Sequence, residues 1–201
     1  MSSGNAVRRI HVVGRKNSGK TTLVCDLVRE LTSRGLRVAT VKHTHHRHEL
    51  DTPGKDSYLH REAGAAAVGI LSPRMTAMFV PSQREGRGED RYELFESQFG
   101  DCDLILVEGD LQTTAPRIEV WRSITGESPY AFSDPGILAV VTDDNPQFNG
   151  DVLLEIKGAR SAQRIGLSGV SRRTGLPRSP VQAAVEFVLA LAADKESPAT
   201  C

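Results

Sequence analysis

One stretch near the N-terminus, residues 8–35, constrains the fold of this chain more than any other. It reads as a short strand over residues 9–13, a glycine-rich turn GRKNSGKT over 14–21, and an amphipathic helix that should end at Gly35. A glycine-rich turn that opens a helix directly after a buried strand places backbone N–H groups and the helix N-terminus around an anion. The order of these three elements therefore predicts an α/β fold with a phosphate site at its first turn.

The turn matches the phosphate-binding loop (P-loop) pattern G-x-x-x-x-G-K-[ST], in the strand and helix context that the pattern requires. In such a loop the lysine ammonium reaches the outer phosphates, and the threonine hydroxyl is a ligand of Mg²⁺. A magnesium-bound nucleotide is therefore the predicted ligand. The residues expected to bind it are Gly14, Asn17, Ser18, Gly19, Lys20, Thr21 and Thr22, with Thr21 also on the metal.

Short apolar runs alternate with helical patterns along the rest of the chain, which is typical of parallel strands joined by crossover helices. We therefore predict a P-loop NTPase-like α/β fold, with a mostly parallel central sheet and helices on both faces. Strands are expected at 36–41, 67–72, 76–80, 103–109, 136–142 and 151–156, helices at 55–65 and 179–193, and an exposed loop that enters a helix at 81–93. The runs 103–109 and 136–142 are expected at the sheet centre, because both are continuously apolar. Residues 1–201 are expected to form one nucleotide-binding domain, with the basic segment 157–180 as a surface insertion or loop.

Charge and composition narrow the classes of partner. The chain has 25 Lys and Arg against 25 Asp and Glu, so no net field draws it to nucleic acid or to an acidic membrane surface. No apolar run approaches the roughly 18 residues of a membrane span, and the N-terminus lacks the apolar centre of a signal peptide. We expect a cytoplasmic protein that binds neither nucleic acid nor membrane, with its three cysteines reduced.

Acidic side chains follow two of the expected strands. A magnesium nucleotide needs a carboxylate at the end of a neighbouring strand, and Glu108 follows the apolar run LILV. Glu108 is therefore the predicted second magnesium ligand and the catalytic carboxylate. Asp143 or Asp144 could accept the two guanine N–H groups, although the Asn-Lys that usually precedes such an aspartate is missing, and a turn-forming Asp pair is the alternative. Neither a Gln nor an arginine finger is evident after Gly109, which predicts slow hydrolysis at most.

The loop after the second expected strand resembles that of the molybdopterin-guanine dinucleotide biosynthesis adaptor family (MobB). After the P-loop, members carry a Lys-His-Thr-His-His segment, an Asp-x-x-Gly-Lys-Asp-Ser segment and a Val-Glu-Gly strand end. These motifs stand here at Lys42–His46, Asp51–Ser57 and Val107–Gly109, and their order and spacing agree over residues 8–150. The chain departs from the family at Asp110–Leu111, where members often have Phe-Lys.

The resemblance implies a GTP-binding α/β fold and a homodimer. It also implies assistance to the guanylyltransferase MobA, which joins GMP to molybdopterin and so makes the guanine dinucleotide form of the molybdenum cofactor. The implied ligands are GTP, Mg²⁺ and molybdopterin or the molybdenum cofactor. The implied activity is at most a slow magnesium-dependent GTPase.

The loop 43–54 and the residues after it supply further candidate contacts. We expect hydrogen bonds from His43 to phosphate or pterin and a magnesium-bound water on Asp51, and we expect Lys55 and Asp56 to contact a second anion or the subunit interface. Within the P-loop, Arg15 and Lys16 are expected either to be solvated or to contact a phosphate across a dimer.

Two other classes of function compete with the adaptor. Histidines at positions 43, 45, 46 and 48 suit a GTPase metallochaperone that carries nickel or zinc in the His43–His48 cluster. The chain lacks the CxxC pair that would strengthen this alternative. A small-metabolite kinase would need a mobile arginine lid, for which REGRGEDR at 84–91 is a weak candidate.

Overall fold

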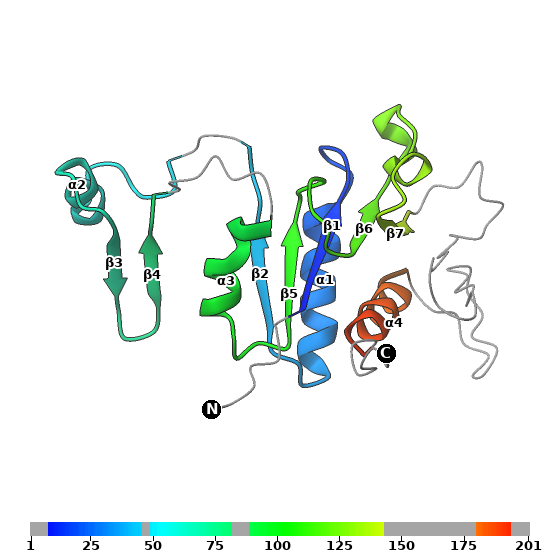
Figure 1. Ribbon diagram of the computed structural model, residues 1–201, viewed down its shortest axis with the longest axis horizontal. Helices are drawn as coiled ribbons and strands as arrows, with labels where there is room; N and C mark the ends of the chain where they lie inside the picture. Colours follow the sequence, from blue (N-terminus) through cyan, green and yellow to red (C-terminus); the bar gives the residue numbers. More distant parts are fainter. Residues whose placement is uncertain (1–7, 46–48, 82–88, 143–179, 194–201) are drawn as a thin grey trace, which may run out of the picture. The chain divides into compact units, whose positions relative to one another are not determined.

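A computed structural model describes residues 8–45, 49–81, 89–142 and 180–193 of the chain (Figure 1). The chain divides into two compact units, one made of Met1–His43 with Tyr92–Cys201 and the other of Thr44–Arg91. The predictions for Asp143, Asp144, His46, His48, the strand 151–156 and all of the segment 157–180 except its last residue lie outside the described residues. The single domain expected over 1–201 stays a prediction.

The first unit is built on a five-stranded sheet in which every neighbouring pair is parallel, with the order β2-β5-β1-β6-β7. Its strands are β1 (Arg8–Val13), β2 (Val38–Lys42), β5 (Leu104–Glu108), β6 (Arg117–Val120) and β7 (Ile137–Val141). The predicted mostly parallel sheet is confirmed. The run 103–109 became the interior strand β5, whereas the run 136–142 became β7, the last strand of the described sheet. The strand predicted at 151–156 lies outside the described residues, so the central position of 136–142 stays a prediction.

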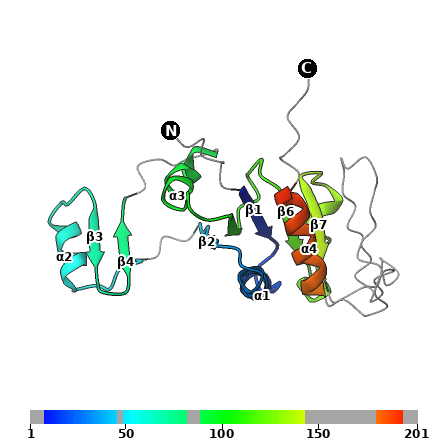
Figure 2. The same cartoon turned by 90° about the horizontal axis from the view of Figure 1, so that it is seen from below.

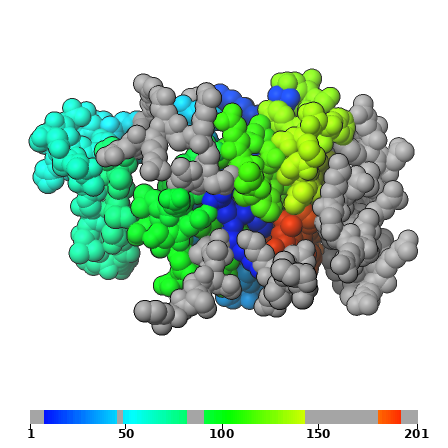
Figure 3. Space-filling model, in the orientation of Figure 1, coloured from blue at the N-terminus to red at the C-terminus, as the bar shows by residue number. Residues whose placement is uncertain are grey.

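Helices cover both faces of this sheet, as predicted. Helices α1 (Lys20–Ser33) and α4 (Pro180–Ala193) lie on one face, and α3 (Glu93–Gln98) lies on the other (Figure 2). Successive side chains along each strand point to opposite faces of the sheet, so the strands contribute to two apolar clusters, one on each face. The larger cluster contains Leu104, Leu106, Ile118 and Val120 with the buried faces of α1 and α4, and the smaller contains Ile105 and Val107 with Tyr92. Figure 3 shows the orange-red α4 directly against the yellow-green segment that contains β6 and β7.

Strand β6 is the element that the sequence prediction missed. It has four residues, RIEV, of which two are charged, so it lacks the apolar run that identified the other strands of this sheet. All four residues are nevertheless buried. Ile118 and Val120 enter the larger apolar cluster, whereas Arg117 and Glu119 point to the other face, where turns supply polar partners.

The segment 81–93 also differs from its prediction as an exposed loop. It enters helix α3 as expected, through the 3₁₀ turn η1 (Glu89–Tyr92), but Tyr92 is buried in the smaller apolar cluster. A tyrosine can be buried among apolar residues when its hydroxyl finds a partner, and here the Tyr92 hydroxyl donates a 2.6 Å hydrogen bond to Asp110.

The second unit contains helix α2 (Asp56–Glu62) and an antiparallel pair, β3 (Val68–Leu71) and β4 (Thr76–Phe79). This confirms the predicted short helix and strand pair. Its polar contacts centre on Arg61, which pairs with Glu49 at 2.7 Å and stacks on Tyr58 and Phe79. Throughout the described parts of both units, no helix is long and apolar enough to cross a membrane.

Candidate functional site

The P-loop joins β1 to α1 with a backbone that depends on glycine. Gly14 and Gly19 have positive φ angles of 143° and 98°, and Asn17 also lies in the left-handed region, at 62°. A Cβ atom on Gly14 would lie 2.3 Å from the Val120 carbonyl oxygen, so a side chain there would displace β6. The glycines of the motif therefore serve two purposes, since they set the turn and they let β6 approach the loop.

Three predicted site residues, Lys20, Thr21 and Glu108, lie where the P-loop enters α1. The Thr21 hydroxyl donates a 2.9 Å hydrogen bond to Glu108 Oε1 at the end of β5, and Lys42 Nζ lies 3.8 Å from the same oxygen. Lys20 Nζ donates to the Arg15 carbonyl at 2.6 Å, within the loop itself. Parallel strands place their carboxyl ends at one edge of the sheet, which explains why residues so distant in sequence meet here.

The Lys20 ammonium is held in an environment that disfavours its charge. Burial lowers its pKa below the ordinary value; Glu108 opposes this shift and Lys42 adds to it. A phosphate beside Lys20 would supply negative charge and raise this pKa again, because an opposite charge favours the ionised form. The site is therefore more favourable electrostatically with an anion beside Lys20.

Strand β6 supplies the second wall of the site. Glu119 pairs in register with Val13, the residue before the P-loop, and its side chain is fully buried. It accepts 2.9 Å hydrogen bonds from the backbone N–H groups of Tyr130 and Ala131, in the 3₁₀ turn η3 (Tyr130–Phe132). Burial raises the pKa of this carboxyl, whereas the two N–H groups lower it. Glu119 thus fixes η3 against the strand next to the P-loop.

Arg15, inside the P-loop, contacts the turn that Glu119 fixes. Its guanidinium lies 2.6 Å from Glu127 Oε2, donates to the Tyr130 hydroxyl at 3.2 Å, and stacks 4.4 Å from the Tyr130 ring centroid. These contacts within one chain differ from the first of the two alternatives for Arg15, a solvated side chain, and the second, a phosphate contact across a dimer, stays a prediction. Because Glu127 and Tyr130 lie on irregular segments, sequence periodicity gave no signal of them.

The corner after Glu108 is fixed from the α3 face of the sheet. Arg9 Nε donates to His11 Nε2 at 3.1 Å, so the proton of neutral His11 is on Nδ1, which lies 3.2 Å from the Gly109 carbonyl oxygen. Asp110, with φ of 66°, accepts from the Tyr92 hydroxyl. This departure from the family's Phe-Lys therefore has a structural role at the corner.

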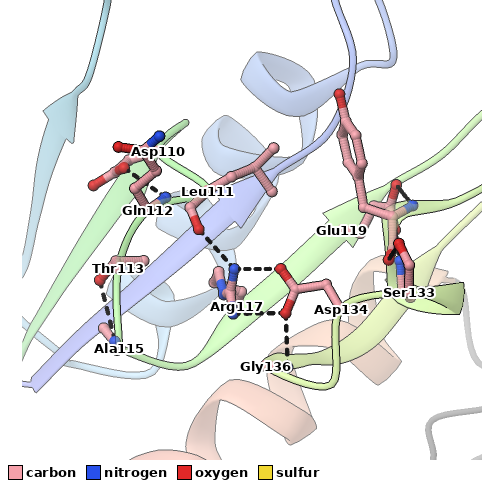
Figure 4. A network of polar contacts seen from close by, with 12 residues as sticks. Asp110, Leu111, Gln112, Thr113, Ala115, Arg117, Glu119, Ser133, Asp134 and Gly136 are labelled. Atoms are coloured by element: carbon pink, nitrogen blue, oxygen red, sulfur yellow. Dashed lines mark hydrogen bonds and ion pairs between the residues drawn. The ribbon is translucent and has the colours of Figure 1, made fainter.

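Figure 4 shows a second set of polar contacts, around Arg117. Its guanidinium forms two hydrogen bonds with Asp134, of 2.6 and 2.9 Å, and donates to the Leu111 carbonyl at 2.7 Å. A Cβ atom on Gly136 would lie 1.8 Å from Arg117 Nη2, so this glycine makes room for the pair. These contacts anchor the segments that precede β6 and β7.

The remaining predicted site residues divide between the two units. His43 follows the end of β2, where its N–H donates to the Glu108 carbonyl at 2.9 Å. Asp51, Lys55 and Asp56 belong to the second unit, where Asp51 Oδ1 accepts from the Thr52 N–H at 2.8 Å and from the Ser57 hydroxyl at 3.0 Å. One carboxylate oxygen of Asp51 therefore orders the turn before α2. The roles predicted for these residues toward phosphate, magnesium or a second anion stay predictions.

The arrangement in the first unit suits one kind of ligand chemistry. A hydroxyl and a carboxylate within hydrogen-bond distance are the oxygen donors that Mg²⁺ prefers, and the ammonium and backbone N–H groups beside them suit phosphate. Across the residues that the structure describes, no group of three or more His, Cys, Asp or Glu side chains could hold a metal ion. Half of the predicted histidine cluster lies outside these residues, so the metallochaperone alternative stays a prediction.

Comparisons with known proteins link this chain to one family. The sequence model of the family described as molybdopterin guanine dinucleotide synthesis protein B (MobB) matches residues 9–143. The molybdopterin-guanine dinucleotide biosynthesis adapter protein of Escherichia coli K12 is 35% identical over 127 residues, which are 63% of this chain and 73% of that protein. The adapter protein of Haemophilus influenzae is 32% identical over 139 residues, 69% of this chain and 76% of that protein. A crystal structure of molybdopterin-guanine biosynthesis protein B has a TM-score of 0.58 and 26% identity, and covers 91% of this chain and 99% of that one.

Proposed function

The chain belongs to the MobB family, and from this premise we propose that it is a GTP-binding adaptor in the biosynthesis of molybdopterin guanine dinucleotide. One observation carries the proposal: the Thr21 hydroxyl and the Glu108 carboxylate lie 2.9 Å apart beside Lys20, at the mouth of the P-loop. A phosphate chain and its magnesium ion need these groups together. The family relatives named as adapter proteins support the biosynthetic role.

The nucleotide is proposed to bind along the P-loop. Its phosphates would be held by the backbone N–H groups of residues 14–22 and by Lys20, which would exchange its contact with the Arg15 carbonyl for a phosphate oxygen. Thr21 and Glu108 would hold Mg²⁺ from one side. Guanine recognition is assigned to Asp143, one of the two aspartates that the sequence offers as acceptors of the guanine N–H groups.

The proposed GTP hydrolysis is slow. Magnesium, when bound, supplies charge that offsets the negative charge of the reacting phosphoryl group. Glu108 contributes by orienting the Thr21 hydroxyl and by keeping a negative charge at the metal position. P-loop GTPases that lack an arginine finger in place turn over at roughly 10⁻⁴ to 10⁻³ per second. A rate in this range is consistent with an adaptor whose partner, the guanylyltransferase MobA, performs the transfer of GMP to molybdopterin.

A homodimer is proposed to form through the second unit. An isolated two-stranded sheet is at best marginally stable in water, yet β3, β4 and the turn between them expose Leu71, Met75 and Met78. Soluble proteins usually bury an apolar surface of this kind against a partner. A second copy of the same hairpin would cover these side chains, while each P-loop unit remained complete by itself.

Parallel titrations of the purified protein with GTP, ATP and molybdopterin, each with and without magnesium, test the proposal. We expect GTP with magnesium to bind more tightly than ATP. Tighter binding of ATP would overturn the guanine assignment. A pull-down from cells that make the cofactor tests the partner, and recovery of neither MobA nor a second copy of the chain would count against the adaptor role.

Single-turnover GTP hydrolysis tests Glu108 directly. Glu108→Gln keeps the size of the side chain and a hydrogen-bond acceptor for Thr21, but it deletes the negative charge. We expect magnesium-dependent hydrolysis to fall more than nucleotide binding. Equal rates for the wild-type and Glu108→Gln proteins would remove Glu108 from the chemistry, and Asp51 would then be the next carboxylate to test.

A further inference from the structure

Arg122, for which the sequence predicts no role, lies beside the P-loop. It follows β6 by two residues, and a Cβ atom built on Gly19 would lie 3.8 Å from Arg122 Nη2. The same Cβ atom would lie 3.8 Å from Val120 Cγ1. Side chains two residues apart on extended backbone point to the same face, so Val120 and Arg122 both approach the loop from the α1 side of the sheet.

The guanidinium is therefore placed next to the N-terminus of α1. Helix α1 starts at Lys20, it has no acidic residue in its first turn, and no side chain caps it at Gly19. The N-terminal end of a helix carries partial positive charge, so an anion bound there would meet both the helix end and the Arg122 guanidinium. Glu108, which accepts from Thr21 and lies near Lys42, belongs to the end of β5.

The backbone of Arg122 has a structural role of its own. The Arg122 carbonyl accepts from the Thr125 N–H at 3.1 Å and from the Thr125 hydroxyl at 2.7 Å, which closes the 3₁₀ turn η2 (Ser123–Thr125). These hydrogen bonds use only the main chain at position 122. Substitution of the side chain consequently leaves these two hydrogen bonds of the turn in place.

We propose that the Arg122 guanidinium contacts the phosphates held by the P-loop, as a second cation beside Lys20 that arrives from β6. This inference rests on the proposed function, because it names a further residue of the same nucleotide site. Arginine suits the position, since its planar group donates several hydrogen bonds to phosphate oxygens and stays charged when partly buried. The ligand that fits is a nucleoside di- or triphosphate with its phosphates on the helix N-terminus.

The proposal changes the expectation drawn from the sequence after Gly109, where no arginine finger is evident. The cation comes instead from the strand on the other side of β1, because β5 and β6 flank β1 and end at the same edge of the sheet. Glu108 and Arg122 thus stand on opposite sides of the loop, with the acid suited to the metal and the guanidinium suited to the phosphates.

Calorimetric titration of Arg122→Gln with GDP and GTP in magnesium tests the proposal. Arg34→Gln is the matched control, because Arg34 caps the opposite end of α1 and pairs with Glu186 at 2.9 Å. We expect Arg122→Gln to weaken nucleotide binding about tenfold, as for the loss of a charge-assisted hydrogen bond, and Arg34→Gln to leave it unchanged. Arg122→Lys should recover part of the loss, and the affinity of Arg122→Gln should depend less steeply on salt concentration.

The outcomes separate this inference from the proposed function. If the wild-type protein binds no nucleotide, the proposed function fails and the inference fails with it. If the wild-type protein binds, Lys20→Ala binds weakly and Arg122→Gln binds like Arg34→Gln, only the inference is overturned. Should Arg122→Gln not fold, the Nε–H resonance of Arg122 in wild-type protein replaces the variant: a shift on titration with GDP supports the contact, and an unchanged resonance at saturation overturns it.

Discussion

The two compact units of this chain differ in how much apolar surface each buries by itself. In the first, helices on both faces of a five-stranded sheet fully bury large side chains such as Leu27, Leu31 and Phe187. In the described part of the second, Val68 is the only buried apolar side chain, while Leu71, Met75 and Met78 are each more than half exposed. The first unit thus has a core of its own, whereas the described part of the second exposes most of its large apolar side chains.

This difference explains how the proposed functions divide between the units. A phosphate site needs groups fixed to within a fraction of an ångström, which a sheet edge surrounded by a packed core provides. A surface that recognises another chain needs exposed apolar side chains, which a thin hairpin provides at the expense of its own stability.

Equivalent substitutions in the two units should have unequal effects on stability. Leu31→Ala removes a fully buried side chain from the first unit and should lower the free energy of unfolding by about 2–5 kcal/mol. Leu71→Ala truncates a side chain that is 86% exposed, and should change it by less than about 0.5 kcal/mol. Urea denaturation followed by circular dichroism, at dilutions where the midpoint no longer depends on concentration, measures both. Similar losses for the two variants would contradict the difference between the units.

Substitution of one lysine in each unit should weaken GTP binding to different extents. Lys20→Ala removes a charge from the P-loop and should weaken GTP binding by roughly 1.5–3 kcal/mol, which is about ten- to a hundredfold. Lys55→Ala, at an exposed position before α2, should weaken it less, even if Lys55 contacts a second anion. Fluorescent-nucleotide titration gives both affinities. An unchanged affinity in Lys20→Ala would remove this residue from the site, and a larger loss in Lys55→Ala would reverse the assignment of the units.

Self-association should be weakened by a charge placed on the β3–β4 hairpin and not by one placed on the surface of the first unit. Leu71→Asp places a charge where the proposed dimer buries an apolar side chain, and should weaken dimerisation by roughly 1–2 kcal/mol, or about tenfold. Ile124→Asp makes a similar change at a residue of the first unit that is 89% exposed, and should have no effect. Sedimentation equilibrium measures the dissociation constants. Equal effects of the two substitutions would place the interface elsewhere.

Acidic residues of the two units should give small pH dependences of opposite sign. Burial raises the pKa of Glu119, so the native state retains this proton above the ordinary pKa. Its contribution to stability is present below the ordinary pKa and is lost as the pH rises through the raised value. The hydrogen bond from Arg61 lowers the pKa of exposed Glu49, whose contribution is present above the ordinary pKa and lost as the pH falls through the lowered value.

The corresponding variants, Glu119→Gln and Glu49→Gln, isolate these contributions. Between about pH 4.5 and 7, the wild-type protein should lose more stability with rising pH than Glu119→Gln does. Glu49→Gln should remove a weak contribution of the opposite sign, reduced by solvent screening. Thermal unfolding measured from below about pH 4.5 up to about pH 7 tests both signs, because the Glu49 contribution is lost below the ordinary pKa and the Glu119 contribution above it. Parallel curves for Glu119→Gln and the wild-type protein would show that Glu119 does not titrate differently on folding.

The elements that the sequence predicted well carry their signal locally. The P-loop, the apolar strand β5 and helix α1 each have a spacing of residues that one element alone explains. Strand β6 has no such local pattern. Its charged residues Arg117 and Glu119 can be buried because distant segments supply their partners, which are Asp134 and the N–H groups of η3. Tyr92 was missed for the same reason, since its partner Asp110 lies 18 residues away.

By itself, the sequence determined the P-loop, the parallel α/β class, the family resemblance and the pairing of Thr21 with Glu108, because glycine spacing, apolar runs and strand ends are local patterns with known geometry. Only the tertiary structure decided the strand order, and with it the neighbours of the P-loop. Through that order β6 lies against Gly14, Glu119 is buried beside Val13, and Arg122 reaches Gly19. These contacts join segments that are far apart in the sequence, so they depend on packing between elements that no local pattern records.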